Sequence, residues 1–293
     1  MTNAILFSGQ GSQYKGMGKE LQNEFKKEYK MAEEILYYSL EELINENGNN
    51  LLDNTLYTQP ALYLVSSLAY KKKMMESNIE FTYAAGHSLG EFCALYAAGV
   101  FDLETGLKIV AKRSKLMSPI QNGAMAAIIG LDDKLVNDIL GDYQDLYISN
   151  YNTKDQTVIS GTKEAIEAVQ EIFINNGAMG YHILNVSCPC HSPFVKKVAE
   201  EFRSYIEQFT FNQPQFHVMS NYTGKEYEFS EIKDTMACQM YNPVKWKQII
   251  TYLMQKNVDN FEIAGPSSAL SKMLNYNLSD AQKNNITLEN IHS

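Results

Sequence analysis

The stretch AAGHSLGEFCAL (residues 84–95) places Ser88 between two glycines, Gly86 and Gly90. This G-x-S-x-G spacing is the pattern of a nucleophile elbow, a sharp turn that holds a serine out from the backbone. A side chain at either glycine position would collide with neighbouring backbone, so the turn requires glycine there. The alternative interpretation is an ordinary glycine turn in which the serine only caps a helix.

The segments on either side of the turn favour the elbow. Residues 81–86 (FTYAAG) predict a short strand, and residues 89–101 (LGEFCALYAAGVF) predict a helix. Free N–H groups at the start of a helix favour negative charge, and the N–H of Leu89 can donate to an oxyanion on an attacked carbonyl. The order of strand, turn and helix makes Ser88 a candidate nucleophile.

A serine nucleophile needs a base, and histidine commonly supplies it. The chain contains five histidines, which are His87, His182, His191, His217 and His292. His87 adjoins the serine, but neighbours around so sharp a turn point apart. His182 and His217 lie in strand-like runs, where a histidine is more often structural, and His292 lies in the tail. His191 follows a predicted strand, and loops at strand ends are where catalytic groups gather. We predict His191 as the base.

Composition and charge exclude several classes of protein. A hydrophobic content of 45% with 20% charged residues is typical of a soluble globular protein, and the net charge of −9 argues against nucleic-acid binding. The four cysteines lack a paired spacing suited to zinc, so no metal site is expected. The N-terminus does not resemble a signal peptide, and no apolar run approaches the roughly 20 residues that cross a bilayer. We expect a reduced, soluble, cytoplasmic protein without a membrane segment.

The order of predicted elements indicates one α/β core interrupted by a small insert. In the first part of the chain, Gln59 and Pro60 are expected to open a helix, with the proline in its first turn. The predicted order later changes to strand, helix, strand, strand, helix, strand, which suits a ferredoxin-like insert. We predict a discontinuous core of residues 1–122 and 192–293, and a small subdomain of residues 123–191.

Motifs along almost the whole chain resemble the family of malonyl-CoA:acyl carrier protein transacylases and the related acyltransferases of polyketide synthases. The matching stretches are SGQGSQYKGMG (8–18), TQPALYLV (58–65), AAGHSLGEFCALYAAGVFD (84–102), KRSKLM (112–117), GAMAAIIGL (123–131), TVISG (157–161), VSCPCHSPF (186–194) and YNPVKW (241–246). Several motifs in one order are far more specific than G-x-S-x-G alone. The motifs TQPALYLV and GHSLGEF are most similar to those of the free-standing, trans-acting acyltransferases that serve polyketide synthases without an acyltransferase of their own.

The resemblance implies a fold and a set of catalytic roles. The fold is an α/β-hydrolase-like core with a parallel sheet and an inserted ferredoxin-like subdomain. Ser88 matches the nucleophile and His191 its base, which in this family is oriented by a backbone carbonyl, here that of Gln239, instead of an aspartate. Gln10, in the GQGSQ loop, matches the residue whose backbone N–H joins that of Leu89 in the oxyanion hole.

The resemblance also implies a binding site for the acyl group. Arg113 matches the arginine that binds the free carboxylate of a malonyl unit, a task suited to a planar, always-charged donor. By charge pattern alone, Arg113 belongs to an ordinary solvated lysine-rich helix face. The expected pocket residues are His87, Met117, Asn152 and Cys190. For Asn152 the alternative is a loop turn, and for the cysteines of the Cys188-Pro189-Cys190 segment it is mere filling of volume.

The implied reaction is ping-pong acyl transfer. A malonyl-type unit passes from a CoA or carrier-protein thioester, through an ester on Ser88, to the phosphopantetheine thiol of an acyl carrier protein, in polyketide or fatty acid biosynthesis. No metal or redox cofactor is implied, nor any nucleic-acid or membrane partner, and the chain is expected to act as a monomer or as part of a synthase. Plain malonyl is the first expectation. A substituted malonyl unit is the alternative. Malonyl-selecting members of the family often carry an aromatic residue just before the histidine in polyketide systems, or serine in the fatty-acid enzymes, and Cys190 in place of an aromatic ring would open space beside the acyl α-carbon.

Two other functions stay open. One is a proofreading hydrolase on the same scaffold, which releases acyl chains from carrier proteins to water; the other is a non-catalytic module that only docks carrier proteins. Docking of an acidic carrier protein needs local positive charge, from Lys196 and Lys197 or from Lys112 and Lys115. The alternative for each lysine is a solvated helix face.

Overall fold

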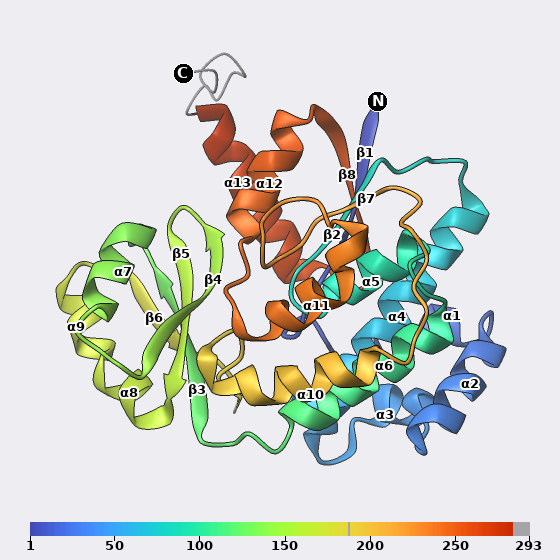
Figure 1. Ribbon diagram of the computed structural model, residues 1–293, viewed down its shortest axis with the longest axis horizontal. Coiled ribbons are helices and arrows are strands. Elements are labelled where there is room, and N and C mark those ends of the chain that lie inside the picture. The colour runs from blue at the N-terminus through green and yellow to red at the C-terminus, as the bar shows by residue number, and fades with distance from the viewer. Residues whose placement is uncertain (187, 284–293) are drawn as a thin grey trace.

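The computed structural model describes residues 1–186 and 188–283, which fold into two lobes, each built on its own four-stranded sheet. Figure 1 shows the smaller lobe, with β3 to β6, beside the larger lobe that holds both the N-terminal strand and the C-terminal helices. The fold class predicted from the sequence, α/β with a parallel sheet and a small inserted sheet, is confirmed.

The sheet of the larger lobe is parallel throughout and runs in the order β7-β2-β1-β8. Its strands are β1 (Thr2–Phe7), β2 (Tyr83–Gly86), β7 (His217–Val218) and β8 (Val258–Ala264). The two central strands read as apolar runs because both of their faces are covered. Successive side chains alternate between faces: Ile5 and Phe7 pack into one cluster, Ala4 and Leu6 into the other.

Helices cover the two faces of this sheet unequally. Ile5 and Phe7 belong to a hydrophobic cluster that also contains residues of α1 (Lys19–Gln22), α2 (Lys26–Leu36), α3 (Leu40–Glu46), α4 (Thr55–Glu76), α5 (Gly90–Ala97), α6 (Leu103–Met117), α10 (Lys196–Ile206) and α11 (Ile232–Tyr241). The opposite face packs against α12 (Trp246–Gln255) and α13 (Ser268–Lys283). Three short 3-10 turns lie directly before helices of this lobe: η1 (Gly48–Asp53) before α4, η2 (Pro193–Val195) before α10 and η3 (Phe229–Glu231) before α11.

The smaller lobe has an antiparallel sheet in the order β4-β5-β3-β6. Its strands are β3 (Gly123–Ile129), β4 (Leu146–Thr153), β5 (Gln156–Thr162) and β6 (Gly180–Ile183). Three helices, α7 (Asp133–Leu140), α8 (Lys163–Ala168) and α9 (Gln170–Asn175), complete the ferredoxin-like order of elements. Along β3, Ala124, Ala126 and Ile128 enter this lobe's own core, whereas Met125 and Ala127 face a cavity between the lobes.

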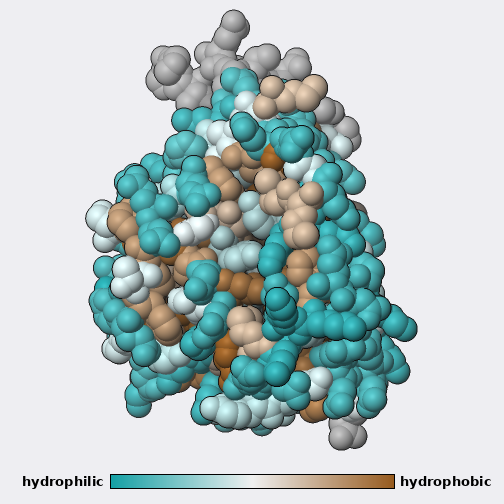
Figure 2. Space-filling view, turned by 90° about the vertical axis from the view of Figure 1, so that its right-hand side faces the viewer, coloured by the Kyte–Doolittle hydropathy of each residue, from teal (hydrophilic) through white to brown (hydrophobic). Residues whose placement is uncertain are grey.

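Figure 2 shows one face of the molecule, largely hydrophilic, with hydrophobic residues in patches toward its middle. Among the described residues, no helix combines the length and the apolar character that crossing a membrane requires.

The predicted start of one helix is wrong. Helix α4 begins at Thr55, five residues before Pro60, because the side chain of Asn54 accepts a hydrogen bond from the Leu56 N–H at 3.0 Å and caps the helix there. Pro60 therefore lies inside the helix, where its missing N–H removes only the bond to one carbonyl of the first turn. The cap, and not the proline, decides where the helix begins.

The two glycines around Ser88 allow backbone segments to touch. A Cβ at Gly86 would lie 1.9 Å from the carbonyl carbon of Gly90, and a Cβ at Gly90 would lie 2.3 Å from the carbonyl oxygen of Phe7 in β1. Real Cβ atoms never approach backbone so closely. The turn from β2 to α5 and its packing on β1 therefore depend on both glycines.

We predict that Gly86→Ala lowers the free energy of unfolding by about 3 kcal/mol, because the clash is with backbone that has nowhere to move. Chemical denaturation of the purified variant measures this loss. Gly48→Ala is the matched control, since a Cβ there meets nothing within 4 Å. Equal stability of the two variants would contradict the prediction.

Candidate active site

Ser88 lies at the top of the turn between β2 and α5, in a strained conformation. Its φ of 52° is in the left-handed region, which residues other than glycine rarely adopt. His191 has the same unusual feature, with a φ of 58°. Strained backbone persists where surrounding structure holds it, and it gathers at functional sites. The turn at Ser88 thus has the conformation expected of a nucleophile elbow.

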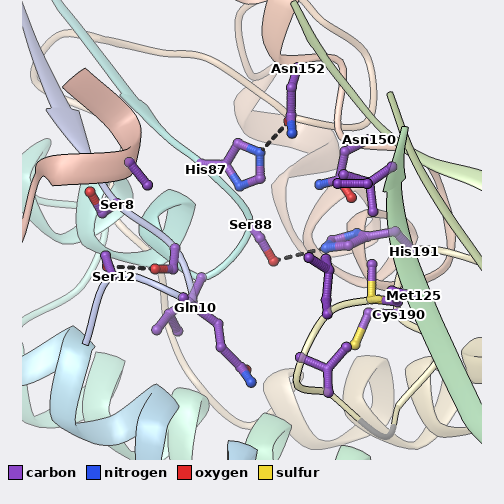
Figure 3. Close-up of a pocket in the computed structure, with 18 of the residues that line it drawn as sticks. Ser8, Gln10, Ser12, His87, Ser88, Met125, Asn150, Asn152, Cys190 and His191 are labelled. Atoms are coloured by element: carbon purple, nitrogen blue, oxygen red, sulfur yellow. Dashed lines mark hydrogen bonds between the residues drawn. The ribbon is translucent and has the colours of Figure 1, made fainter. Parts of the chain in front are cut away.

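The side chains of Ser88 and His191 meet, although 103 positions separate them in the chain. Ser88 Oγ lies 2.8 Å from His191 Nε2, within reach for transfer of a proton. Figure 3 shows the two side chains pointing toward each other from the elbow and from the loop after β6. Of the other histidines, exposed His182 lies on β6 and His217 on β7, where it contacts Glu226. His292 lies outside the described residues.

His191 is held by helix α11 through two hydrogen bonds. Its backbone N–H donates to Met240 O at 3.0 Å, and its Nδ1 lies 2.8 Å from Gln239 O. In a longer helix the Gln239 carbonyl would accept from the residue four places on, but that residue is Pro243, which has no N–H. Because a carbonyl only accepts, Nδ1 carries the ring proton, and Nε2 is left bare to accept from the Ser88 hydroxyl.

The two backbone N–H groups that the family resemblance assigns to an oxyanion hole both lie beside Ser88. Leu89 and Gln10 both line the cavity into which Ser88 points. In the described part of the chain neither N–H has an intramolecular acceptor, whereas the Ser88 N–H donates to Asn221 Oδ1 at 2.7 Å. The Gln10 loop can approach the elbow closely because Gly9 has no side chain. A Cβ at Gly9 would lie only 2.4 Å from His87 O.

Arg113 is buried, with 2% of its surface exposed, in contrast to the solvated helix face that its charge pattern favours. Its Nη1 donates to Gln59 Oε1 at 2.5 Å and its Nη2 to Gln239 Oε1 at 3.3 Å, and both acceptors are neutral amides. Its buried Nε has no acceptor within the described residues. A buried cation with only neutral partners is costly, so this position favours an anionic ligand.

The predicted pocket residues line one cavity of about 560 Å³ between the lobes, together with Ser88 and Arg113. His87 turns away from the nucleophile, since its Nε2 lies 2.9 Å from Asn152 Oδ1, as Figure 3 shows. Met117 and Cys190 also line the cavity, and Cys188, by contrast, is buried in the core of the larger lobe.

Burial controls the charge of the catalytic pair. Desolvation and, less strongly, the positive charge of Arg113 lower the pKa of His191 to about 3, from an ordinary value of 6.5. His191 is therefore neutral throughout the physiological range. Burial also lowers the pKa of His87. The residues that the structure describes contain no group of three or more His, Cys, Asp or Glu arranged to hold a metal ion.

The lysines considered for docking differ in exposure. Lys196 and Lys197 are exposed at the start of α10, directly after the His191 loop. Lys115 is exposed on α6, whereas Lys112 is partly buried, with its Nζ 5.6 Å from the centre of the Tyr205 ring. The pair on α10 therefore offers positive charge closest in sequence to the catalytic loop.

Sequence reasoning missed three buried polar residues that contact this site, Gln59, Glu91 and Asn221. Each has a signal in the sequence. Gln59 and Glu91 are polar residues inside apolar helical runs, and Asn221 directly follows a strand-like segment, FHVMSN. A buried polar side chain needs hydrogen-bond partners. Gln59 accepts from Arg113 and Asn221 from the Ser88 N–H, whereas Glu91 reaches the site only through Asn221, whose N–H it accepts.

Comparisons with known proteins identify the family. Residues 5–287 match the family described as the acyl transferase domain. The chain is 42% identical over 280 residues to the polyketide biosynthesis malonyl CoA-acyl carrier protein transacylase PksC of Bacillus subtilis (strain 168), which covers 94% of this chain and 97% of that relative.

Two solved structures have nearly the same fold. One is a malonyl CoA-acyl carrier protein transacylase from Burkholderia pseudomallei, with a TM-score of 0.92 and 36% identity, covering 95% of this chain and 98% of that one. The other is a malonyl-transacylase in complex with a type II polyketide synthase acyl carrier protein, with a TM-score of 0.91 and 31% identity, covering 95% and 94%.

The lowered pKa of His191 predicts an unusual pH profile. An ordinary histidine, with a pKa near 6.5, loses about tenfold of its neutral form between about pH 7.5 and pH 5.5. His191 stays neutral across this range, so covalent labelling of Ser88 by an uncharged fluorophosphonate should remain nearly constant. Circular dichroism at each pH checks that the protein stays folded. A tenfold loss of labelling rate while the fold persists would contradict the prediction.

Proposed function

Because this chain belongs to the acyl transferase domain family and is an acyltransferase, we propose that it moves a malonyl-type group between thioesters through an ester on Ser88. The donor is malonyl-CoA or a related acyl thioester, and the acceptor is the phosphopantetheine thiol of an acyl carrier protein. The observation that carries the proposal is the buried Arg113, which has no anionic partner among the described residues and lines the same cavity as Ser88.

In the first half-reaction, His191 Nε2 takes the proton of the Ser88 hydroxyl while Oγ attacks the thioester carbonyl carbon. The negative charge that develops on the carbonyl oxygen is stabilised by the N–H groups of Leu89 and Gln10. Collapse of this intermediate breaks the carbon–sulfur bond, and the leaving thiolate takes the proton from His191. The product is an acyl ester of Ser88.

The second half-reaction reverses the first with a different thiol. The carrier protein's thiol gives its proton to His191 and attacks the ester, and Ser88 recovers the proton as the acyl thioester leaves. Gln239 O holds the Nδ1 proton throughout, so the imidazole keeps the tautomer that both steps need. Only protons and an acyl group move, so the proposed reaction uses no metal and no redox cofactor.

Arg113 is proposed to select acyl groups that carry a free carboxylate. A carboxylate in the cavity would supply the anion that the guanidinium of Arg113 lacks. The planar guanidinium can offer two N–H donors to the two oxygens of such a group. Neutral acyl chains leave the buried cation uncompensated, which disfavours them. This selection argues for a carboxylated extender unit and against a hydrolase of neutral acyl chains.

The finer identity of the acyl unit depends on the wall near His191. Cys190 lines the cavity with a small side chain. We infer that plain malonyl is accepted and that the space beside Cys190 also admits a substituent on the acyl α-carbon. The setting proposed for the reaction is a reducing cytoplasm, in keeping with four cysteines that are all free thiols.

The proposed partner is an acyl carrier protein, in keeping with the similar transacylase whose structure contains one. Exposed Lys196 and Lys197 follow the His191 loop directly, so they place positive charge beside the catalytic loop despite the overall charge of −9. We propose that an acidic carrier protein docks over this end of α10.

We predict that incubation with malonyl-CoA adds one malonyl group to the intact protein, and that Ser88→Ala abolishes the addition. Intact mass spectrometry measures the adduct, and methylmalonyl-CoA in a parallel sample tests the substituted unit. Addition of a carrier protein bearing phosphopantetheine should move the group to that protein. Rapid release of free malonate would instead indicate a hydrolase, and binding of carrier protein without any adduct would indicate a docking module.

We predict that Arg113→Ala lowers kcat/KM for malonyl-CoA by about 100-fold, or about 3 kcal/mol, because the substrate carboxylate loses the buried cation proposed to bind it. Loading from acetyl-CoA should not fall, since acetyl has no carboxylate. Steady-state kinetics with both donors measures the change in selectivity. Arg203→Ala is the control, because Arg203 contacts Asp234 and Glu207 at the surface. Equal losses for both donors would contradict the assigned role.

A further inference from the structure

The elbow at Ser88 is held by a side chain from a distant part of the chain. Asn221 Oδ1 accepts a hydrogen bond from the Ser88 N–H at 2.7 Å, and Asn221 Nδ2 donates to Gly86 O, also at 2.7 Å. One amide thus spans the turn and fixes the peptide groups before and after His87. Asn221 is fully buried, so water does not compete for either bond.

The position of Asn221 follows from the parallel sheet. Strand β7 pairs with β2, and the Met219 N–H donates to Ala84 O at 2.8 Å just past the paired residues. The carboxyl ends of the two strands therefore lie side by side, and the chain after β7 passes beside the elbow. The Asn221 carbonyl is fixed in turn by the Lys245 N–H at 3.0 Å.

A buried carboxyl group holds Asn221 from the other side. The Asn221 N–H donates to Glu91 Oε2 at 2.6 Å, and the Tyr227 hydroxyl donates to Glu91 Oε1. Glu91 lies in the first turn of α5, the helix that begins directly after the elbow. The contacts close a ring: from Ser88 to Asn221, from Asn221 to Glu91, and from Glu91 through the helix back to Ser88.

We propose that Asn221 is a positioning residue for the Ser88 nucleophile, and that Glu91 acts through it. This inference rests on the proposed function only in taking Ser88 as the nucleophile. A serine with a φ of 52° is in a disfavoured conformation, which persists only when neighbouring groups hold it. Asn221 supplies two of these restraints, and Gln239 supplies a third, because its Nε2 donates to Ser88 O at 2.7 Å.

The restraint has two chemical consequences. It keeps Ser88 Oγ at hydrogen-bond distance from His191 Nε2, and it occupies the Ser88 N–H. The occupied N–H cannot bind an oxyanion, so that task falls to the N–H of Leu89, the next residue, with that of Gln10. Asn221 touches neither substrate nor a transferred proton. Its role is to set the orientation in which these groups work.

Glu91 does not need a negative charge for this role. Burial raises its pKa to about 8, so the side chain is largely protonated near neutral pH. A glutamine keeps the acceptor, because its amide oxygen can still accept from the Asn221 N–H. Its NH2 group, like the hydroxyl of a protonated carboxyl, can donate to the Tyr227 oxygen, which reverses the direction of that bond but keeps the contact. A leucine of similar size offers neither group. Glu91→Gln and Glu91→Leu are therefore a matched pair.

The test measures the rate at which a fluorophosphonate labels Ser88, which needs the nucleophile, the base and the oxyanion hole but no carboxylate site. Asn221→Ala should label about 100-fold more slowly, the cost of misplacing a reacting group by about an ångström. Malonyl loading should show the same loss in kcat with KM little changed, because Arg113 is untouched. Asn45→Ala is the matched control: it also removes hydrogen bonds of an asparagine side chain, to Gln22 and far from the site.

Rescue and coupling separate positioning from general stability. Glu91→Gln should retain most of the labelling rate, and Glu91→Leu should lose it. Adding Glu91→Leu to Asn221→Ala should cost no more than about a further twofold, since residues that act through one another are not additive. The proposal would be overturned if the double variant lost labelling rate by the product of the two single losses. It would also be overturned if Asn221→Ala were labelled as fast as Asn45→Ala.

Two controls show whether a negative result counts against the role of Asn221. One tests whether each variant folds, and the other tests whether Ser88 is the nucleophile. Circular dichroism and thermal unfolding report on the fold of each variant. Should Asn221→Ala not fold, Asn221→Asp keeps the size and the acceptor for Ser88 N–H but loses the donor to Gly86 O, and it should still label slowly. Unaltered labelling by that variant would overturn the proposal. Absence of labelling in the wild-type chain would instead reject Ser88 as nucleophile.

Discussion

The site depends on three places where backbone meets backbone without an intervening side chain. Cβ atoms at Gly86 and Gly90 would collide with Gly90 itself and with Phe7, and one at Gly9 would collide with His87. These contacts bring the loop after β1 against the turn after β2, which sets the N–H groups of two separate segments around one point. The oxyanion site is thus a product of close sheet packing and not of a single motif.

Electrostatics divides the cavity into two regions. Near Ser88 the charge is kept low: the base is neutral, and it is oriented by a carbonyl that Pro243 leaves free. At Arg113 a full positive charge is buried among amide oxygens. An acyl group with a carboxylate at one end and a thioester at the other complements both regions at once.

Much of the fold and part of the site could be predicted from the sequence. The elbow is local, so its glycines and flanking apolar runs indicate it, and the fold class and the family are confirmed. The roles of Gln10, Gln239 and Arg113 came from family resemblance, because their contacts join distant segments; the charge pattern around Arg113 even points the wrong way, to solvent. Asn221 and Glu91 were missed for the same reason, and the start of α4 because the cap at Asn54 outweighs Pro60.

The alternation of side chains along β3 places part of the cavity lining on a different lobe from the Ser88–His191 pair. Met125 and Ala127 line the cavity from the smaller lobe, whereas Ser88 and His191 are anchored to each other and to α11 in the larger one. Replacing a residue on that strand therefore reshapes the chamber for the acyl chain without touching the machinery that breaks and forms bonds.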